Sequence, residues 1–469
     1  MILKSKLIKR TILVLLGLYL IAICAQYLFV SSPSKTAGAS AEINTSSASG
    51  DRATIIETGS GAMDARLNLI ANAETSLTIG TYLFADDQSG RTITSALLNA
   101  ADRGVHIRIL TDGMIGAVNL LGSDLGYVLA SHENIQMRYY NPVNLLEPWN
   151  LNARFHEKYV IADDHIMLLG GRNISNEFLT PADHEQYNYD MDVLIWREYP
   201  AQGSAIASVS SYFDELWLAH CAPAFQSIPS RKAESVQALR ESLGETYASL
   251  QGDRAEVLAP IDWAAKTVPI DGFALLSNPT EPGDTTPLLW AELTSLMRSA
   301  KERIWIQTPY LVLNGQMRDD MEAIASLPTD LLVLTNSRAG GNNIVASADA
   351  VIHSGMLRRM DINRYEFQGD RSMHTKAMVI DDDISIIGSF NFDMRSAYID
   401  TELMLVIKSA DINQMLASHM TEMLSDSLPV LADGNYGDNS NAAPKSISFG
   451  KNLLILISSP FVSLFRYLV

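Results

Sequence analysis

Two clusters of histidine, lysine and asparagine, one in each half of the chain, contain the side chains of this sequence most suited to chemistry. In each cluster the histidine and the lysine are two residues apart, so on a strand both side chains point to the same face. The asparagine follows the lysine at the same spacing in both clusters. Two imidazoles, two ammonium groups and two amides can form a pocket for one phosphodiester. The residues are His156, Lys158 and Asn173 in the first cluster and His374, Lys376 and Asn391 in the second.

Such a pocket can transfer a phosphoryl group by covalent catalysis. One histidine attacks phosphorus and forms a phosphohistidine intermediate, while the other protonates the departing alcohol and then activates the incoming one. The lysines and asparagines bind the non-bridging oxygens, whose negative charge rises in the transition state. Because the lysines supply the positive charge, we expect the site to need no metal and no other cofactor.

An attacking imidazole needs an acid that holds its other ring nitrogen. Asp192 and Glu402 are the candidates, since each stands at the start of an apolar strand. Asp190 and Asp400, two residues earlier in each copy, are the alternatives.

Four more residues repeat around the two clusters. Asp163 and Asp381 come five residues after the lysines, and this odd spacing points them away from the histidine face of the strand. We therefore expect these two acids to be structural and to lie at the turn into the next strand. Tyr82 and Tyr310 end equivalent strands, where they can either line the substrate pocket or pack in the core.

The repeated pattern predicts a duplicated α/β fold. Apolar runs at 159–161 and 165–169 recur at 377–380 and 384–387, and helical patterns flank each set. The acids after them, with Asp192 aligned to Glu402, repeat at a shorter offset than the clusters do. This difference predicts an insertion in the first copy, between 178 and 189. Two α/β sandwich repeats related by a pseudo-twofold axis can bring both clusters together.

The two ends of the chain are apolar. Residues 11–30 contain no charge, follow a basic start and are long enough to cross a bilayer, so an uncleaved anchor is favoured over a cleaved signal peptide. The basic start places the body outside the cytoplasm. The apolar residues 453–469 either pack on the core or lie in the membrane interface. The predicted segments are an anchor (1–35), a flexible tether (36–58), a first repeat (59–225), a connecting segment (226–285), a second repeat (286–432), and a linker with the apolar C-terminal segment (433–469).

The composition excludes some classes of protein. The 469 residues carry a net charge of −18, which disfavours binding to the phosphate backbone of nucleic acid. One cysteine, Cys221, lies outside the N-terminal apolar run, so a disulfide framework is excluded. Each repeat supplies its own cluster, and we therefore expect no obligate protein partner.

The duplicated motif resembles the HxKxxxxD motif of the phospholipase D superfamily. Residues 388–402 and 169–178 are similar to the second and first motif regions of bacterial cardiolipin synthases. The resemblance implies that one motif histidine is the nucleophile, usually the first, which is His156 here. It implies that the other is the general acid and base, and that the motif lysines and asparagines bind phosphate. Gly171 and Met394 depart from the serine and proline that are usual at these positions.

The resemblance further implies a membrane-anchored enzyme that exchanges phosphatidyl groups between phospholipids, with phosphatidylglycerol as donor and acceptor. Its partners would then be the phospholipid substrate and the bilayer. The alternative is a phospholipase D that uses water as the acceptor and releases phosphatidic acid. A nuclease is disfavoured by the acidic body, and a non-catalytic scaffold by the two intact motifs.

Overall fold

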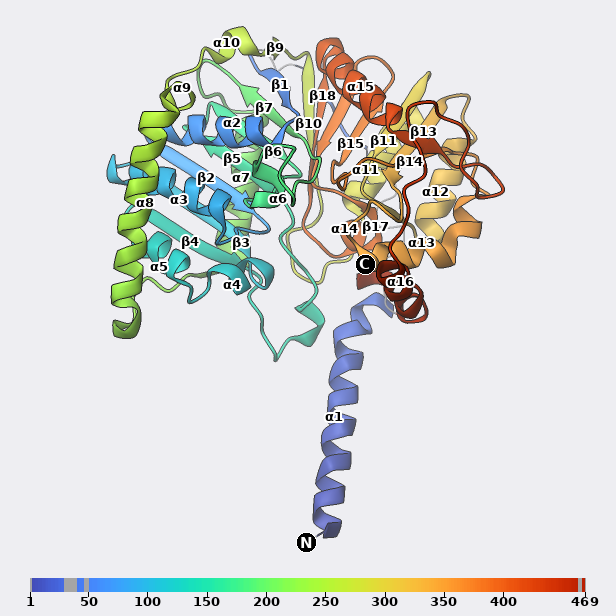
Figure 1. Cartoon of the computed structure of the whole chain (residues 1–469), viewed down its shortest axis with the longest axis horizontal. Helices are drawn as coiled ribbons and strands as arrows, with labels where there is room; N and C mark the ends of the chain where they lie inside the picture. The colour runs from blue at the N-terminus through green and yellow to red at the C-terminus, as the bar shows by residue number, and fades with distance from the viewer. Residues whose placement is uncertain (1, 29–39, 46–49, 463–465, 469) are drawn as a thin grey trace.

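In the computed structural model the chain forms two lobes, each built on one large β-sheet, and helix α1 (Ile2–Leu28) extends away from them (Figure 1). The structure describes residues 2–28, 40–45, 50–462 and 466–468; within α1 it describes the side chains of residues 10–23. The first sheet has the order β8-β4-β3-β2-β5-β6-β7-β1-β9, and the second has the order β10-β18-β16-β15-β11-β13-β14-β19.

The strands of the first sheet are β1 (Arg52–Ile56), β2 (Ser76–Thr81), β3 (His106–Asp112), β4 (Ile135–Tyr140), β5 (Lys158–Ala162), β6 (Ile166–Gly170), β7 (Asp192–Trp196), β8 (Cys221–Pro223) and β9 (Val268–Pro269). Those of the second are β10 (Gly272–Ser277), β11 (Arg303–Gln307), β13 (Asp330–Asn336), β14 (Asn363–Phe367), β15 (Ala377–Ile380), β16 (Ile384–Gly388), β18 (Leu403–Lys408) and β19 (Ser427–Pro429). The short strands β12 (Leu311–Val312) and β17 (Phe392–Asp393) pair with each other.

The strand orders match over eight strands when β8 is aligned with β19 and β1 with β10. The predicted duplication into two α/β repeats is therefore confirmed at the level of topology. In both repeats the motif strand, β5 or β15, lies in the middle of the sheet and is antiparallel to the two strands beside it.

The strands are buried on both faces, and alternate residues of a strand reach different cores. In β5, Val160 packs in the outer core of the first lobe, whereas Tyr159 and Ile161 pack in a central core. The central core also takes Val379 of β15 and Leu405 of β18, so it joins the two sheets. The two repeats thus share one apolar layer, as a pseudo-dimer requires.

Helices complete the layers. The outer core of the first lobe contains residues of α2 (Gly59–Asn72), α3 (Gln88–Asp102), α5 (Asp124–Ala130) and α8 (Ala233–Asp253), and that of the second contains residues of α11 (Leu288–Ser299), α12 (Gly315–Ala325), α13 (Ile344–Leu357) and α16 (Phe449–Val462). Helices α7 (Ala205–Ala219) and α15 (Ala410–Ser425) contribute to the central core. The short helices are α4 (Ile115–Leu120), α6 (Asn176–Leu179), α9 (Ala255–Leu258), α10 (Trp263–Lys266) and α14 (Met394–Tyr398).

Two predicted segment boundaries are wrong. Strand β1 lies inside the predicted tether (36–58), and β10 lies inside the predicted connecting segment (226–285), yet each pairs along its whole length with a strand of its repeat. Both are short strands at the start of a repeat, and their partners β7 and β18 lie near the other end of that repeat. Pairing over such a separation leaves no local pattern in the sequence.

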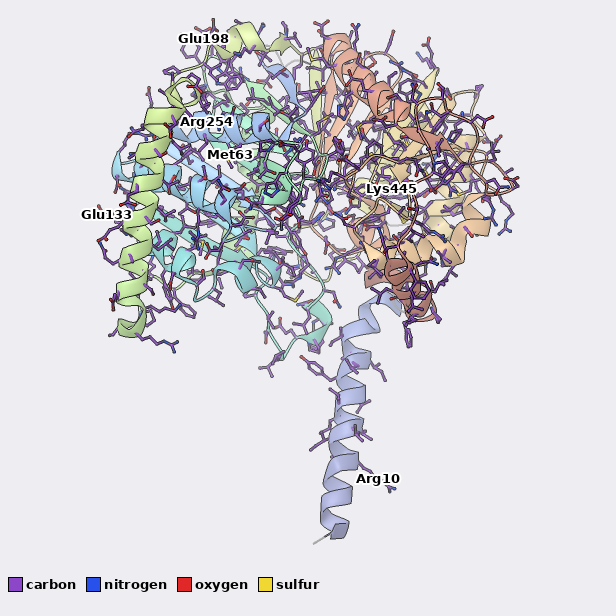
Figure 2. All side chains as sticks on the ribbon, in the orientation of Figure 1. Arg10, Met63, Glu133, Glu198, Arg254 and Lys445 are labelled. Atoms are coloured by element: carbon purple, nitrogen blue, oxygen red, sulfur yellow. The ribbon has the colours of Figure 1, made fainter. Side chains whose placement is uncertain are left out.

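The N-terminal prediction is only partly covered, because residues 29 and 30 of the apolar run lie outside the described residues. Among the residues that the structure describes, no helix is both long and apolar enough to cross a membrane. In Figure 2 the labelled Arg10 lies on α1 well away from the two lobes.

Candidate active site

The two motifs come together because each motif loop pairs with the backbone of the other repeat. Phe155 forms a β-bridge with Thr401, and Tyr189 forms one with Met373. The amide of His156 donates to the carbonyl oxygen of Thr401 at 3.3 Å. Residues 189 and 401 lead into β7 and β18, so the acids that precede these strands arrive beside the histidines of the opposite repeat.

Each motif histidine is held by a buried acid of the other repeat. His156 Nδ1 lies 2.8 Å from Glu402 Oε1, and His374 Nδ1 lies 2.7 Å from Asp190 Oδ2. Glu402 is 0% exposed and Asp190 is 1% exposed, so water does not compete for these bonds. An Nδ1–H that donates to an acid leaves Nε2 unprotonated and available for reaction.

The sequence predicts Asp192 as a partner of a motif histidine, and this prediction is wrong. Asp192 Oδ2 instead lies 2.8 Å from Arg66 and 3.5 Å from Arg172. Of the two alternatives, Asp190 takes the histidine, whereas Asp400 bonds to Arg395 at 2.8 Å.

The error arises from the alignment of the two repeats. Leu169 pairs with Val193, and Ile387, the counterpart of Leu169 in the second repeat, pairs with Leu405. Val193 is therefore the counterpart of Leu405, which aligns Asp190 with Glu402 and Asp192 with Met404. The insertion in the first copy is correspondingly shorter than the sequence pattern predicts.

The same register explains the glycine at position 171. A Cβ atom there would lie 2.4 Å from Asp190 Oδ1, so the carboxylate occupies the space of a side chain. In the second repeat, Ser389 fills the equivalent position and its hydroxyl donates to Glu402. Ser396 adds a second hydroxyl bond to Glu402, at 2.6 Å. The sequence analysis did not predict these two serines as site residues. The difference between Gly171 and Ser389, at equivalent positions of the two repeats, was the signal that could have identified Ser389.

The motif lysines are buried behind the histidines. Lys158 and Lys376 are each 2% exposed, and each donates to the backbone carbonyl of its own motif histidine. Lys376 Nζ also lies 2.9 Å from His374 Nδ1. Tyr82 packs edge-on against His156, with ring centroids 5.0 Å apart, and its ring lies 5.4 Å from Lys158 Nζ. Tyr82 therefore contacts both the histidine and the lysine of the first motif.

The two asparagines carry unsatisfied atoms. Within the described part of the chain, Oδ1 of Asn173 and Oδ1 of Asn391 are buried without a hydrogen-bond partner. Buried polar atoms almost always have partners. Asn173, Tyr310 and His374 line a cavity of about 300 Å³. A ligand in this cavity can satisfy the first of these amides.

Burial sets the ionisation of the site. It lowers the pKa of His374 to about 4 and that of His156 well below its usual range, and Lys376 and Lys158 add to the effect. Burial also lowers the pKa of Lys158 to about 8 and that of Lys376 to about 7. At neutral pH both imidazoles of the free protein are therefore uncharged, as a nucleophile or a general base requires.

The two acids differ. Burial raises the pKa of Glu402 to about 7. Burial also acts on Asp190, but His374, Lys376 and Arg172 outweigh it and lower the pKa of this carboxyl below its usual range. Asp190 is therefore the firmer anionic partner, which favours a charged imidazolium at His374 over one at His156.

Asp163 and Asp381 lie at the turns after β5 and β15, where both have a positive φ. Asp163 accepts hydrogen bonds from the amides of Glu74, Thr75 and Ser76 at 2.8 Å, so it fixes the start of β2. Asp381 accepts hydrogen bonds from the amides of residues 301–303, at the start of β11, in the same way. These contacts are structural and lie at the opposite end of the motif strand from the histidine.

Asp163→Ala is expected to destabilise the fold by about 2 kcal/mol, because charge-assisted bonds to three amides are lost. Although burial opposes it, bonds from Glu74, Ser76 and Thr75 lower the pKa of Asp163. This stabilisation is present above the pKa of the unfolded state and disappears as the pH falls through the lower, folded-state pKa. Asp164→Ala is the matched control, since Asp164 also has a positive φ but is exposed. Thermal unfolding of both variants tests the prediction; equal losses would contradict it.

Comparisons with known proteins match most of both repeats. A family model described as "Cardiolipin synthase, PLD-like domain" matches residues 67–217 and 293–424. Cardiolipin synthase C of Escherichia coli (strain K12) is 28% identical over 418 residues, covering 76% of this chain and 81% of that protein. A probable cardiolipin synthase of Bacillus subtilis (strain 168) is 23% identical over 375 residues, covering 78% of this chain and 64% of that protein.

A solved structure has a similar fold. The phosphatidylserine synthase of Haemophilus influenzae superposes with a TM-score of 0.65 at 14% identity, covering 93% of this chain and 98% of that one. At this level of identity the likeness concerns the fold.

Proposed function

The chain belongs to the phospholipase D superfamily, as a cardiolipin synthase-like phosphatidyltransferase, and from this premise we propose that it forms cardiolipin from two molecules of phosphatidylglycerol. The observation that carries the proposal is the pair of histidines, each held by a buried acid of the opposite repeat and each accompanied by a lysine and an asparagine. This arrangement suits a two-step transfer through a covalent intermediate.

In the first step, Nε2 of His156 attacks phosphorus, a P–N bond forms, and the P–O bond to the departing glycerol breaks. His374, in its protonated form, gives its proton to the glycerol oxygen. Binding of the anionic phosphodiester favours that protonated form. Lys158, Lys376, Asn173 and Asn391 bind the non-bridging oxygens in the transition state.

In the second step, His374 takes the proton from a hydroxyl group of the second phosphatidylglycerol. The hydroxyl oxygen attacks phosphorus and the P–N bond to His156 breaks, which releases cardiolipin and restores both histidines. Water in place of the lipid alcohol would give phosphatidic acid, the product of the hydrolytic alternative.

The purified full chain, incubated with phosphatidylglycerol vesicles and EDTA, tests the proposal. We expect cardiolipin and glycerol by mass spectrometry, at a rate that EDTA leaves unchanged. Phosphatidic acid as the main product would establish the hydrolase instead. The absence of both lipid products, with the protein folded, would refute the proposal.

The rate is expected to fall as the pH rises from about 7 to 9. The pKa of Lys376 is lowered to about 7 and that of Lys158 to about 8, so over this pH range both lose the positive charge that binds phosphate. Because each lysine must be charged, activity is retained below its pKa and lost above it. Lys376→Arg keeps its charge at alkaline pH, so the fall in rate is expected to begin at a higher pH in this variant. An unchanged profile in this variant would contradict the assignment.

We also propose that the N-terminal segment anchors the protein to the membrane and that the body lies outside the cytoplasm. The uncharged run of residues 11–30 and the basic residues before it support this. The apolar side chains described in α1, such as Leu13 and Ile21, are 66% and 60% exposed. Protease added to intact spheroplasts is expected to digest the body; protection of the body would contradict this orientation.

The C-terminal helix α16 gives a second apolar surface. It packs on the core through Ile455, Ser459 and Val462, so the inward face contains a serine. Its outward face carries exposed apolar side chains, among them Leu454 at 56% and Ile457 at 57%. A helix that is apolar on its outer face suits the membrane interface better than water.

The loop before β5 lies at the same end of the body as α16 and α1 (Figure 1). Its Leu145 and Leu146 are 66% and 86% exposed. We therefore propose that α16 and this loop rest on the lipid surface beside the anchor, which keeps the active site near its substrate.

Replacing both Leu454 and Ile457 by Asp is expected to lower activity on phosphatidylglycerol vesicles about tenfold or more, because charged side chains oppose insertion into the interface. Activity on monomeric short-chain phosphatidylglycerol should remain within about twofold, since the site is untouched. Leu218→Asp, on α7, is the control, because Leu218 is 79% exposed and lies on neither surface. Equal losses on both substrates would contradict the docking role.

A further inference from the structure

The cavity beside His374 is built from both repeats. The lining residues that matter here are Asn173, Glu177 and Asn188 from the first repeat and Ser337, Asn342 and Asn343 from the second. Its volume of about 300 Å³ is enough for a small polar group but not for acyl chains. His374 itself borders this space.

A chain of hydrogen bonds crosses the cavity wall between the repeats. Asn342 Nδ2 donates to Asn188 Oδ1 at 3.0 Å, and Asn188 Nδ2 donates to Glu177 Oε2 at 3.3 Å. Asn188 is 5% exposed, so these bonds hold its amide in one orientation. The wall therefore presents a preorganised row of amide and carboxylate groups.

This lining suits hydroxyl groups. A hydroxyl both donates and accepts, as do amides, and Oδ1 of Asn173 is buried without a partner among the described residues. The acidic and basic residues of the lining are equal in number: Glu177 and Glu366 against Arg338 and Arg364. An ammonium headgroup would need an excess of acids, which this wall does not supply.

The chemistry of displacement at phosphorus gives the cavity a position in the reaction. The attacking and departing atoms lie on opposite sides of phosphorus, so the alcohol leaves on the side of the acid and base histidine. The incoming alcohol must then attack from the same side, because it displaces the nucleophile. A hydroxyl-binding cavity next to His374 therefore matches the place of both alcohols.

We propose that this cavity is the glycerol headgroup subsite, used first by the departing glycerol and then by the headgroup of the acceptor phosphatidylglycerol. Asn188 and Asn342 determine the preference for a polyol acceptor. The assignment makes His374 the general acid and base and His156 the nucleophile. It rests on the proposed transferase function and adds the acceptor's chemical class to it.

Competition between acceptors tests the subsite. The full chain is incubated with phosphatidylglycerol vesicles and 1-butanol, and cardiolipin, phosphatidylbutanol and phosphatidic acid are measured together. All three products arise from one phosphatidyl-enzyme, so their ratio reports only the acceptor step. Asn342→Leu and Asn188→Leu are compared with Asn119→Leu, a matched change on α4, where Asn119 bonds within its own helix.

In the wild type we expect cardiolipin to be favoured over phosphatidylbutanol. Asn342→Leu and Asn188→Leu are expected to lower this ratio about tenfold, the effect of losing a hydrogen bond to an acceptor hydroxyl. Asn342→Gln, which keeps an amide donor, should retain most of the wild-type ratio. Phosphatidic acid, formed with water, shows that a variant is folded and active.

Two results would overturn the subsite: a wild type without preference for the polyol acceptor, or a product ratio that neither leucine variant changes. A wild type that forms none of the three products would instead refute the proposed function.

Discussion

A phosphatidyl ester of p-nitrophenol is expected to separate the roles of the two histidines. Nitrophenolate leaves without a proton donor, so His374→Ala should release about one equivalent of nitrophenolate per protein. Its later turnover should be about a thousandfold slower than that of the wild type, because no base activates the acceptor. His156→Ala should release none. The difference follows from the position of His374 beside the headgroup cavity.

Absorbance of nitrophenolate measures the burst, and mass spectrometry of the peptide around His156 locates the phosphatidyl group. His106→Ala is a suitable control, since His106 lies on the exposed start of β3 and outside both clusters. A burst in His156→Ala and none in His374→Ala would reverse the assignment of nucleophile and base.

Removing the charge of either histidine-bound acid should have the second-largest effect. Asp190→Asn and Glu402→Gln are each expected to lower kcat by about 10²- to 10⁴-fold with little change in KM, because the amide favours the wrong imidazole tautomer. Since burial raises the pKa of Glu402 to about 7 while that of Asp190 is lowered, Asp190→Asn is expected to be the more damaging.

Asp192→Asn is the informative comparison. Asp192 lies two residues from Asp190 but binds Arg66 and Arg172, so its loss leaves buried positive charge and should cost about 3 kcal/mol of stability. We expect a lower melting temperature and a kcat reduced at least about tenfold less than in Asp190→Asn. Steady-state kinetics below the melting temperature, with circular dichroism for folding, distinguish the two. An equal loss of kcat would contradict the assignment of Asp190.

Much of the fold follows from local patterns. The strands that flank the motifs are continuous apolar runs and the helices before them have helical apolar spacing, so 159–161 and 384–387 were predicted within β5 and β16. Strands β1 and β10 were missed, because their pairing with β7 and β18 is a long-range property.

The sequence by itself determined the chemical groups of this protein: two copies of a histidine and a lysine two residues apart, with an asparagine after the next strand. The identical spacing of these groups in the two copies is a property of the sequence, although the histidines themselves lie just before the strands β5 and β15. Only the tertiary structure decided which acid serves which histidine. His156 takes Glu402 and His374 takes Asp190 because the motif loops bridge to the opposite repeat. That exchange is set by the packing of two sheets across a shared apolar core, a contact between residues far apart in the chain that no local pattern records.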